Sequence, residues 1–415
     1  MALSSPGTDT TGSGSSPAPR PNRGLLPLLL AGNTAMYALY VGVPGMLLAL
    51  QIEAIDPAEK VANFGLVSGV SAIFATVFNP VAGALSDRSG RRNPWILAGG
   101  LLAVPVMFLL GGVDTILLVM IAWCLGQAVM NVYQAALTSV VPDRVPPSAR
   151  GRASAAVGLG LPIGSTIGAL VGAAFSEDYR TGYLVFGVIV AATAVLFTLC
   201  ARERRMPAKA PMPVRAQLAA FGSALKEHDF RWAFIGRALL VLGYFAVAGF
   251  QLYILKDHTE LPAGLSAEEA VAILMPVNGV AMVVSTVLGG WLSDRYDRRK
   301  LFVGASAALA AVALVIPAVS TSWTAMLAFS VVNGLGFGCY MAVDTALVTL
   351  VLPKAEDAAR DMGVLNIANA GPQIVAPFVA SLIVSASGGY TALFLAAAVL
   401  SVLGALAVRP IRSVR

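Results

Sequence analysis

Two charged residues lie deep inside long apolar segments of this 415-residue chain. Asp344 is the only carboxylate well within such a segment, and Arg237 lies six residues after Arg231 at the start of another. Burial disfavours a charged carboxylate, so Asp344 can exchange a proton when water reaches it. It could instead pair with a partner that holds two parts of the fold together, or anchor a cationic ligand. Arg237 could bind a ligand or extend its long side chain to the nearby water boundary.

Other polar residues recur at helical spacing within the apolar segments. In the first segment Asn33, Tyr37 and Tyr40 are three or four residues apart, which places them on one face of a helix. Four more segments carry such faces: Gln127, Asn131 and Gln134; Arg237, Tyr244 and Gln251; Asn333, Tyr340 and Asp344; and Asn366, Asn369 and Gln373. Polar groups in lipid are costly, so together these faces are expected to line an interior cavity. The alternative for any one residue is a hydrogen bond between helices.

The segments that carry these residues have the length and composition of membrane spans. The chain is 57% hydrophobic and 12% charged, and its mean hydropathy is +0.77. Backbone polar groups inside a bilayer must be satisfied within the chain, so the spans are expected to be helices. The sequence predicts an all-α membrane protein with twelve helices, at residues 24–50, 61–83, 93–112, 115–141, 152–176, 181–201, 231–255, 268–292, 299–319, 322–352, 361–386 and 389–408.

A charged ten-residue motif occurs twice, each time between two apolar segments. The first copy runs from Gly83 to Arg92 and the second from Gly290 to Arg299, which is 207 residues later. A repeat at half the chain length indicates an internal duplication. The motif resembles the G-x-L-x-D-R-x-G-R-R signature of the major facilitator superfamily; the second copy has Asp297 at the last Gly position.

The resemblance implies two pseudo-symmetric six-helix bundles with a solute site between them. It implies that helices 1, 4, 7 and 10 line the cavity, and that the signature loops close its cytoplasmic side. The expected gate residues are Gly83, Asp87, Arg88, Gly90, Arg91, Arg92, Gly290, Asp294, Arg295, Arg298 and Arg299, with Asp87 pairing with Arg91 or another arginine. The expected domains are a disordered tail (1–23), a first bundle (24–201), a linker (202–230), a second bundle (231–408) and a short tail (409–415).

The distribution of basic residues fixes an expected orientation. If the amino terminus is cytoplasmic, 24 of the 28 Lys and Arg residues fall on the cytoplasmic side. The positive-inside rule therefore favours a multi-pass protein of the bacterial cytoplasmic membrane with both termini inside. The rule also accounts for the net charge of +6, so no basic patch is left over for a nucleic acid.

Catalytic chemistry has little support in this sequence. The three cysteines lie in apolar segments without metal-ligand spacing, and neither histidine, His228 or His258, lies within a segment. No catalytic residue, metal site or cofactor is therefore expected, and the protein is not expected to be an enzyme.

The sequence thus favours a secondary transporter that moves a small organic solute by alternating access, with proton coupling through Asp344. Both a drug or natural-product efflux antiporter and a sugar or metabolite importer remain open. Helix 4 lacks the Arg that drug antiporters usually carry, and Leu161 precedes Pro162 where those antiporters have Gly, which weakens the efflux alternative. A non-transporting membrane receptor is the alternative from another class. The expected partners are the solute, a proton and the lipid bilayer, and the protein is expected to be a monomer.

Overall fold

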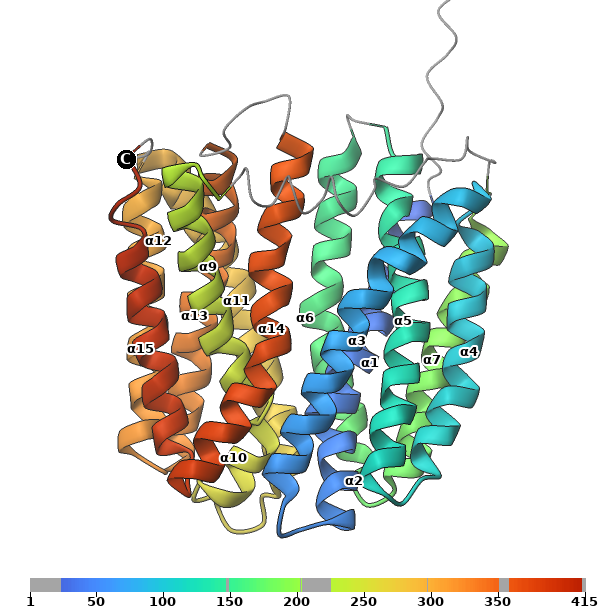
Figure 1. Ribbon diagram of the computed structural model, residues 1–415, viewed down its shortest axis with the longest axis horizontal. Coiled ribbons are helices and arrows are strands. Elements are labelled where there is room, and N and C mark those ends of the chain that lie inside the picture. Colours follow the sequence, from blue (N-terminus) through green and yellow to red (C-terminus); the bar gives the residue numbers. More distant parts are fainter. Residues whose placement is uncertain are drawn as a thin grey trace, which may run out of the picture.

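The computed structural model describes residues 24–146, 149–201, 203, 225–296, 298–350 and 358–412 (Figure 1). At 345, 346, 348–350 and 358–366 it describes the backbone alone. The expected tail 1–23, most of the expected linker 202–230 and the last residues of the tail 409–415 lie outside the described residues, as does Asp297. Within the described ranges the chain forms helices and no sheet.

The first half of the chain forms six helical spans. The first span consists of α1 (Leu25–Gly42), the π-helical turn η1 (Val43–Leu47) and α2 (Leu48–Ile55). The others are α3 (Lys60–Ser89), α4 (Asn93–Gly111), α5 (Ile116–Arg144), α6 (Arg150–Ala174) and α7 (Tyr179–Cys200).

The second half repeats this plan. Its first span is α9 (His228–Ala248) followed by α10 (Gln251–Asp257), and the others are α11 (Ala267–Tyr296), α12 (Arg299–Val319), α13 (Trp323–Leu350), α14 (Ala358–Ser387) and α15 (Thr391–Ala407). Among the described residues, eleven spans are long and apolar enough to cross a membrane, and α15 is a shorter apolar helix. The prediction of twelve helices in two six-helix bundles is confirmed.

The first span is longer than the predicted range 24–50, because its polar end is buried. Pro44 has no backbone N–H, and the π turn that contains it lets the helix continue past this missing donor. Gln51 then donates hydrogen bonds to the carbonyl oxygens of Leu110 and Val113 at the end of α4, at 2.8 and 2.9 Å. The free carbonyl groups at the end of α4 thus accept the hydrogen bonds that the buried Gln51 side chain needs.

The two ends of the molecule carry different charges. We call the end where α3 finishes and α12 begins the basic end, after Arg88, Arg91, Arg152, Arg298 and Arg409; it is the upper end in Figure 1. We call the other the ion-pair end, after Glu53, Lys60, Lys256, Asp257 and Glu268.

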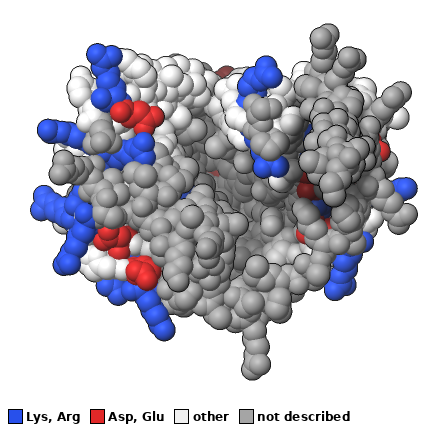
Figure 2. Space-filling view, turned by 90° about the horizontal axis from the view of Figure 1, so that it is seen from above, with Lys and Arg blue, Asp and Glu red and all other residues white. Residues whose placement is uncertain are grey.

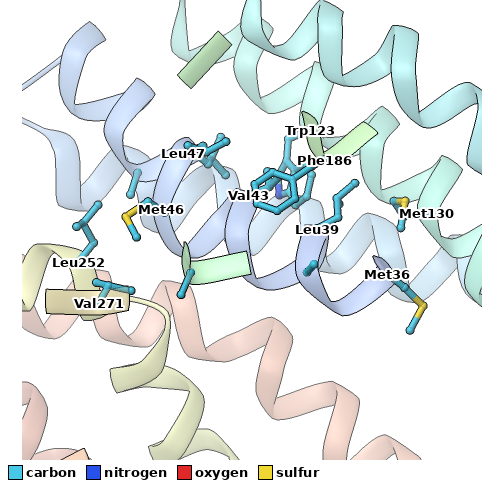
Figure 3. Packing of buried hydrophobic residues seen from close by; sticks show 14 of the residues in the cluster. Met36, Leu39, Val43, Met46, Leu47, Trp123, Met130, Phe186, Leu252 and Val271 are labelled. Carbon is cyan, nitrogen blue, oxygen red and sulfur yellow. The ribbon is translucent and has the colours of Figure 1, made fainter. Parts of the chain in front are cut away.

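The two halves contact each other mainly along two pairs of helices, α3 with α14 and α6 with α11, and α10 also contacts η1. A buried hydrophobic cluster continues across this boundary near the ion-pair end. Met46 of the first half belongs to it together with Leu252 and Val271 of the second half (Figure 3). The halves are therefore packed together at the ion-pair end.

Two glycines of α3 allow the close approach of α14. A Cβ atom at Gly65 would lie 2.2 Å from the Cβ of Ser381, and one at Gly69 would lie 2.3 Å from the ring of Phe378. Small residues at such positions let two membrane helices approach each other closely. These glycines are therefore required by the packing of the two halves.

Replacing Gly65 with Leu should separate α3 from α14. Overpacking of this kind costs about 1 to 3 kcal/mol, so we expect a lower apparent melting temperature of the purified protein. The matched control is Gly158→Leu, because a Cβ there meets nothing within 4 Å. Equal melting temperatures for the two variants would mean that α3 and α14 do not pack closely in the membrane protein as purified.

Candidate functional site

Arg237 and Asp344 form an ion pair in the interior of the second half. The Nε atom of Arg237, on α9, lies 3.4 Å from the Oδ2 atom of Asp344, on α13. Both side chains are buried, with 9% and 3% of their surfaces exposed. Because both helices belong to the same half, this pair does not hold the two halves together.

The geometry of the pair is loose for a buried ion pair. Neither Arg237 Nε nor Asp344 Oδ2 has a hydrogen-bond partner among the described residues. Tyr340, one turn before Asp344 on α13, interacts with the carboxyl group through its side chain. Coulombic attraction offsets the cost of burying two charges only when hydrogen bonds satisfy them well. The pair is therefore suited to being separated by a proton or by a ligand.

The remaining predicted residues of α9 and α13 lie in different surroundings. Tyr244 stacks on Phe337, with ring centroids 3.8 Å apart and planes at 14°. Asn333 is buried in α13. Gln251 is half-buried and begins α10, after the helix breaks at Gly249 and Phe250. The predicted single face of the seventh span is thus divided between two helices.

In the first half, hydrogen bonds between helices connect several predicted residues. Tyr40 donates to the Oε1 atom of Gln134 at 3.2 Å and so connects α1 with α5. Asn79 of α3 donates to the Oδ1 atom of Asn131 at 2.7 Å. The backbone carbonyl of Gln127 accepts from the side chain of Asn131 at 2.8 Å. Sequence reasoning missed Asn79, although it is an amide inside an apolar segment.

Asn33 and Tyr37, predicted to share a cavity face, differ in burial. Asn33 is 1% exposed and donates to the carbonyl oxygen of Leu29 in its own helix. A Cβ at Gly160 of α6 would lie 2.6 Å from the Cβ of Asn33, so this residue packs between two helices. Tyr37 is half-buried. At the basic end the molecule is hollowed between its halves (Figure 2).

The predicted residues of α14 are only partly described. Gln373 is exposed and Asn369 is half-buried, whereas the side chain of Asn366 lies outside the described residues.

The first signature copy forms a network at the basic end. The Asp87 carboxylate pairs with Arg92, and Arg92 Nε also lies 2.9 Å from the Oδ2 atom of Asp143 at the end of α5. A further nitrogen of Arg92 donates to Ser86 at 2.5 Å. Gly90 ends α3 with φ of 62°, a left-handed conformation that favours glycine. The partner of Asp87 is Arg92, whereas Arg91 is exposed.

Glu203 completes this network and was missed from the sequence. Its Oε1 atom accepts from the backbone N–H groups of Arg92 and Asn93, and it lies 2.7 Å from Arg144 Nη2. The carboxylate thus stabilises the positive end of α4. The only sequence signal for Glu203 was its position in an Arg-rich stretch just after α7, the last span of the first half.

Replacing Glu203 with Ala should destabilise the first half. The change removes the acceptor for two N–H groups at the start of α4 and leaves Arg144, which is 12% exposed, without this carboxylate. Losing partners of buried polar groups costs about 1 to 3 kcal/mol, so the melting temperature should fall. Glu177→Ala, at an exposed loop position, is the control. Equal melting temperatures would show that the Glu203 contacts contribute nothing.

The second signature copy is more exposed. Arg299 pairs with Asp294 at 3.0 Å, and the Arg295 guanidinium lies 5.3 Å from the centre of the Trp291 ring. Gly83 and Gly290 have room around them, since added Cβ atoms would meet nothing within 4 Å and one methyl group at 3.9 Å, respectively. Arg88 and Arg298 are exposed. The Asp–Arg pair of each signature copy, Asp87 with Arg92 and Asp294 with Arg299, therefore lies within its own half.

The ion-pair end, by contrast, joins the two halves. Lys60 lies 2.8 Å from Asp257, and Lys256 lies 2.8 Å from Glu53. Within each half, Lys60 also contacts Glu53 at 2.8 Å, and Lys256 contacts Glu268 at 3.0 Å. Lys60 and Lys256 are two of the four Lys and Arg residues that the expected orientation leaves off the cytoplasmic side, but the sequence gave no sign that they pair across the halves.

Aromatic residues reinforce this closure. The Tyr253 hydroxyl donates to the carbonyl oxygen of Ala49 at 2.7 Å, and Phe64 makes an edge contact with Phe250 with centroids 5.1 Å apart. Lys256 contacts Glu53 of the first half and Glu268 of the second half at the same time, so its ammonium group lies between two carboxylates.

No group of three or more His, Cys, Asp or Glu side chains that could hold a metal ion occurs in the part of the chain that the structure describes.

The family profile of the Major Facilitator Superfamily matches residues 28–277 and, a second time, residues 233–414. The chain belongs to this superfamily. Among its relatives, "MFS transporter asaE" of Aspergillus flavus is 24% identical over 339 residues, which cover 78% of this chain and 72% of that protein. Monocarboxylate transporter 12 of Xenopus laevis is 29% identical over 139 residues, 32% of this chain and 30% of that protein.

Solved structures show the same fold. A peptide transporter POT in complex with sulfate has a TM-score of 0.73 at 14% identity, covering 94% of this chain and 96% of that one. A bacterial homolog of the human lysosomal transporter Spinster, in an inward-facing and unoccupied conformation, has a TM-score of 0.69 at 15% identity, covering 94% and 95%. At these identities the likeness concerns the fold alone.

Proposed function

We propose that this protein moves a small organic solute across the cytoplasmic membrane by alternating access, and that Asp344 couples the movement to a proton. The observation that carries the proposal is the buried pair of Arg237 and Asp344, 3.4 Å apart and without hydrogen bonds from the two facing atoms. Ionisable residues within membrane spans are costly and are typical of ion and substrate pathways.

The coupling step follows from the charges of the pair. While Asp344 is ionised it neutralises Arg237. A proton on Asp344 removes this attraction and leaves the Arg237 guanidinium free to bind an anionic group, which it can contact bidentately. Proton binding and anion binding then favour each other. The proton removes the carboxylate charge that competes for Arg237, and the anion neutralises the guanidinium that keeps Asp344 ionised.

A single guanidinium released in this way favours a solute with one negative charge, such as a small monocarboxylate. The name of the Xenopus laevis relative agrees with that class, although the match covers about a third of each chain. Tyr244, Gln251 and the Tyr40–Gln134 pair supply rings and amides for the rest of the solute. A cationic or neutral solute, as an efflux pump or a sugar importer would carry, is the competing case.

The basic end is proposed to face the cytoplasm, with both chain termini there. The positive-inside rule supports this orientation, because Arg88, Arg91, Arg152, Arg298 and Arg409 gather at that end. The hollow at the basic end and the ion pairs at the other end correspond to a conformation open to the cytoplasm (Figure 2). The protein is proposed to act as a monomer.

Proton movement on solute binding tests the proposal. Purified protein in a weakly buffered detergent solution is mixed with a monocarboxylate, a sugar or a cationic drug while a pH indicator is followed. At a pH where Asp344 is partly protonated, an anion that takes Arg237 should cause proton uptake by Asp344, and a cation that takes ionised Asp344 should cause proton release from the protonated fraction. The sign therefore separates the solute classes.

The signal should disappear in Asp344→Asn and persist in Asp114→Asn, the same change at an exposed carboxylate. If a solute binds the wild type and Asp344→Asn equally well and neither protein takes up or releases a proton, Asp344 is not the coupling site. Proteoliposomes separate a transporter from a receptor, since a receptor would bind solute without accumulating it inside the vesicles.

A further inference from the structure

A groove lies between α12 and α15 at the outer surface of the second half. Its volume is about 750 Å³. Its walls are apolar and formed by Leu301, Gly304, Ala305 and Ala308 of α12 and by Val402, Ala405 and Leu406 of α15, with Val408 beyond the end of α15. Leu301, Val402 and Leu406 are 59%, 45% and 41% exposed, so the groove faces the surroundings of the bundle and not its interior.

The walls leave space for a long apolar ligand. A Cβ atom added at Gly304 would meet nothing within 4 Å. From Arg298 to Ala308 the groove follows α12 for ten residues, which is about 15 Å at 1.5 Å per residue. Since a bilayer's hydrocarbon core is about 30 Å thick, the groove extends through roughly one leaflet.

Three basic residues surround the groove at the basic end. Arg298, Lys300 and Arg409 all line it. Lys300 Nζ is held in place, because it donates to the carbonyl oxygens of Arg409 and Ile411 at 2.6 and 2.7 Å. The side chains of Arg298 and Arg409 are exposed and make no ion pair or hydrogen bond with a described residue.

The start of α12 adds further donors. Arg298 occupies the N-cap position of this helix without a side-chain capping bond, the first turn holds no acidic residue, and no side chain that the structure describes accepts from the first N–H groups. Free N–H groups at a helix start attract anions. Asp294, the described carboxylate nearest in sequence, is paired with Arg299 and not with Arg298. Lys and Arg side chains lie at this edge of the basic end, on the side of α12 and α15, with some Asp and Glu side chains among them (Figure 2).

We propose that this groove binds an anionic phospholipid of the leaflet at the basic end, with its phosphate between Arg298, Lys300 and Arg409 and an acyl chain against Gly304 and Ala308. Basic pockets between membrane helices on the cytoplasmic side suit such headgroups. A phosphate ion would use the charged rim alone, and a zwitterionic lipid has no net negative charge to complement the three basic residues of the rim.

Lipid binding to the purified full-length protein tests the proposal. Dissociation constants for phosphatidylglycerol and phosphatidylcholine are measured by native mass spectrometry, for the wild type and for Arg298→Gln/Arg409→Gln. Each arginine near a charged lipid surface contributes about fivefold in affinity, so the double variant should bind phosphatidylglycerol on the order of 25-fold more weakly. Its affinity for phosphatidylcholine should change little.

The matched control is Arg91→Gln/Arg152→Gln, which removes the same charge from exposed positions of the first half. Equal losses in the two double variants would overturn the site. Gly304→Leu gives an independent test: it fills the groove, keeps every charge, and should weaken phosphatidylglycerol binding as well. Competition by inorganic phosphate with unchanged binding in Gly304→Leu would identify an ion site and overturn the lipid.

Discussion

Replacing Asp344 with Asn is expected to abolish proton-driven accumulation of the solute. Without an ionisable group at this position a pH gradient cannot be converted into a solute gradient, so accumulation in proteoliposomes should fall to the level reached without a gradient. The change also leaves Arg237 as an unpaired buried charge, which typically costs about 3 to 5 kcal/mol of stability. Radiolabelled solute uptake with an inward-directed proton gradient measures the first effect, and thermal unfolding of the purified protein measures the second.

The double variant Arg237→Gln/Asp344→Asn separates the two effects. It removes both charges, so most of the lost stability should return, whereas proton-driven accumulation should not. Asp114→Asn is the control for a carboxylate change at an exposed position. If the double variant accumulates solute against its gradient as the wild type does, Asp344 is a structural partner of Arg237 and the coupling proton binds elsewhere.

Apolar segment length and the repeated motif were sufficient to predict the fold. Twelve spans in two halves follow from the thickness of a bilayer and from the duplication between Gly83 and Gly290. The boundaries that differ were decided by contacts distant in sequence. Gln51 continues the first span because carbonyl groups at the end of α4 accept its hydrogen bonds, and no local pattern reveals that partner.

The candidate site was harder to predict than the fold. The cost of charge in lipid singled out Arg237 and Asp344 as residues, but their contact depends on the rotation of α9 and α13 about their axes. Helical spacing placed Asn33 on the same face as Tyr37, yet Asn33 packs on Gly160 of α6. One face of a helix covers a wide arc. Residue spacing alone therefore does not show whether a side chain lies at the centre of the face, toward a cavity, or at its edge, against a neighbouring helix.

The contacts between the halves were the least predictable part. Gly65 and Gly69 read as ordinary small residues of a membrane helix, although they permit the approach of α14. Lys60 and Lys256 marked only the orientation of the chain, because ion pairs between residues 197 and 203 positions apart leave no pattern in a single sequence. These contacts matter because they hold closed the end of the molecule opposite the hollow.

Reversing the charge at Glu53 is expected to open the ion-pair end. Glu53 lies 2.8 Å from both Lys60 and Lys256, and only the second pair crosses the halves. In Glu53→Lys a third positive charge replaces the shared carboxylate, so both pairs are lost and the lysines repel one another. These partly buried pairs contribute about 1 kcal/mol each. Because only the Glu53–Lys256 pair crosses the halves, its loss together with the added repulsion should change the free-energy difference by about 1 to 2 kcal/mol, which shifts the ratio of closed to open conformers roughly 5- to 30-fold.

Distance measurements between spin labels can follow this shift. Labels at Ala58 and Ala263, exposed loop positions in different halves at this end, would be placed in a variant without Cys124, Cys200 and Cys339. The distance should lengthen in Glu53→Lys and less in Glu53→Gln, which removes the pairs without adding repulsion. Glu59→Lys makes the same charge change at an exposed position and should keep the short distance. If all three variants give the wild-type distance distribution, apolar packing around Phe64, Phe250 and Tyr253 closes this end, and the ion pairs do not contribute measurably to its closure.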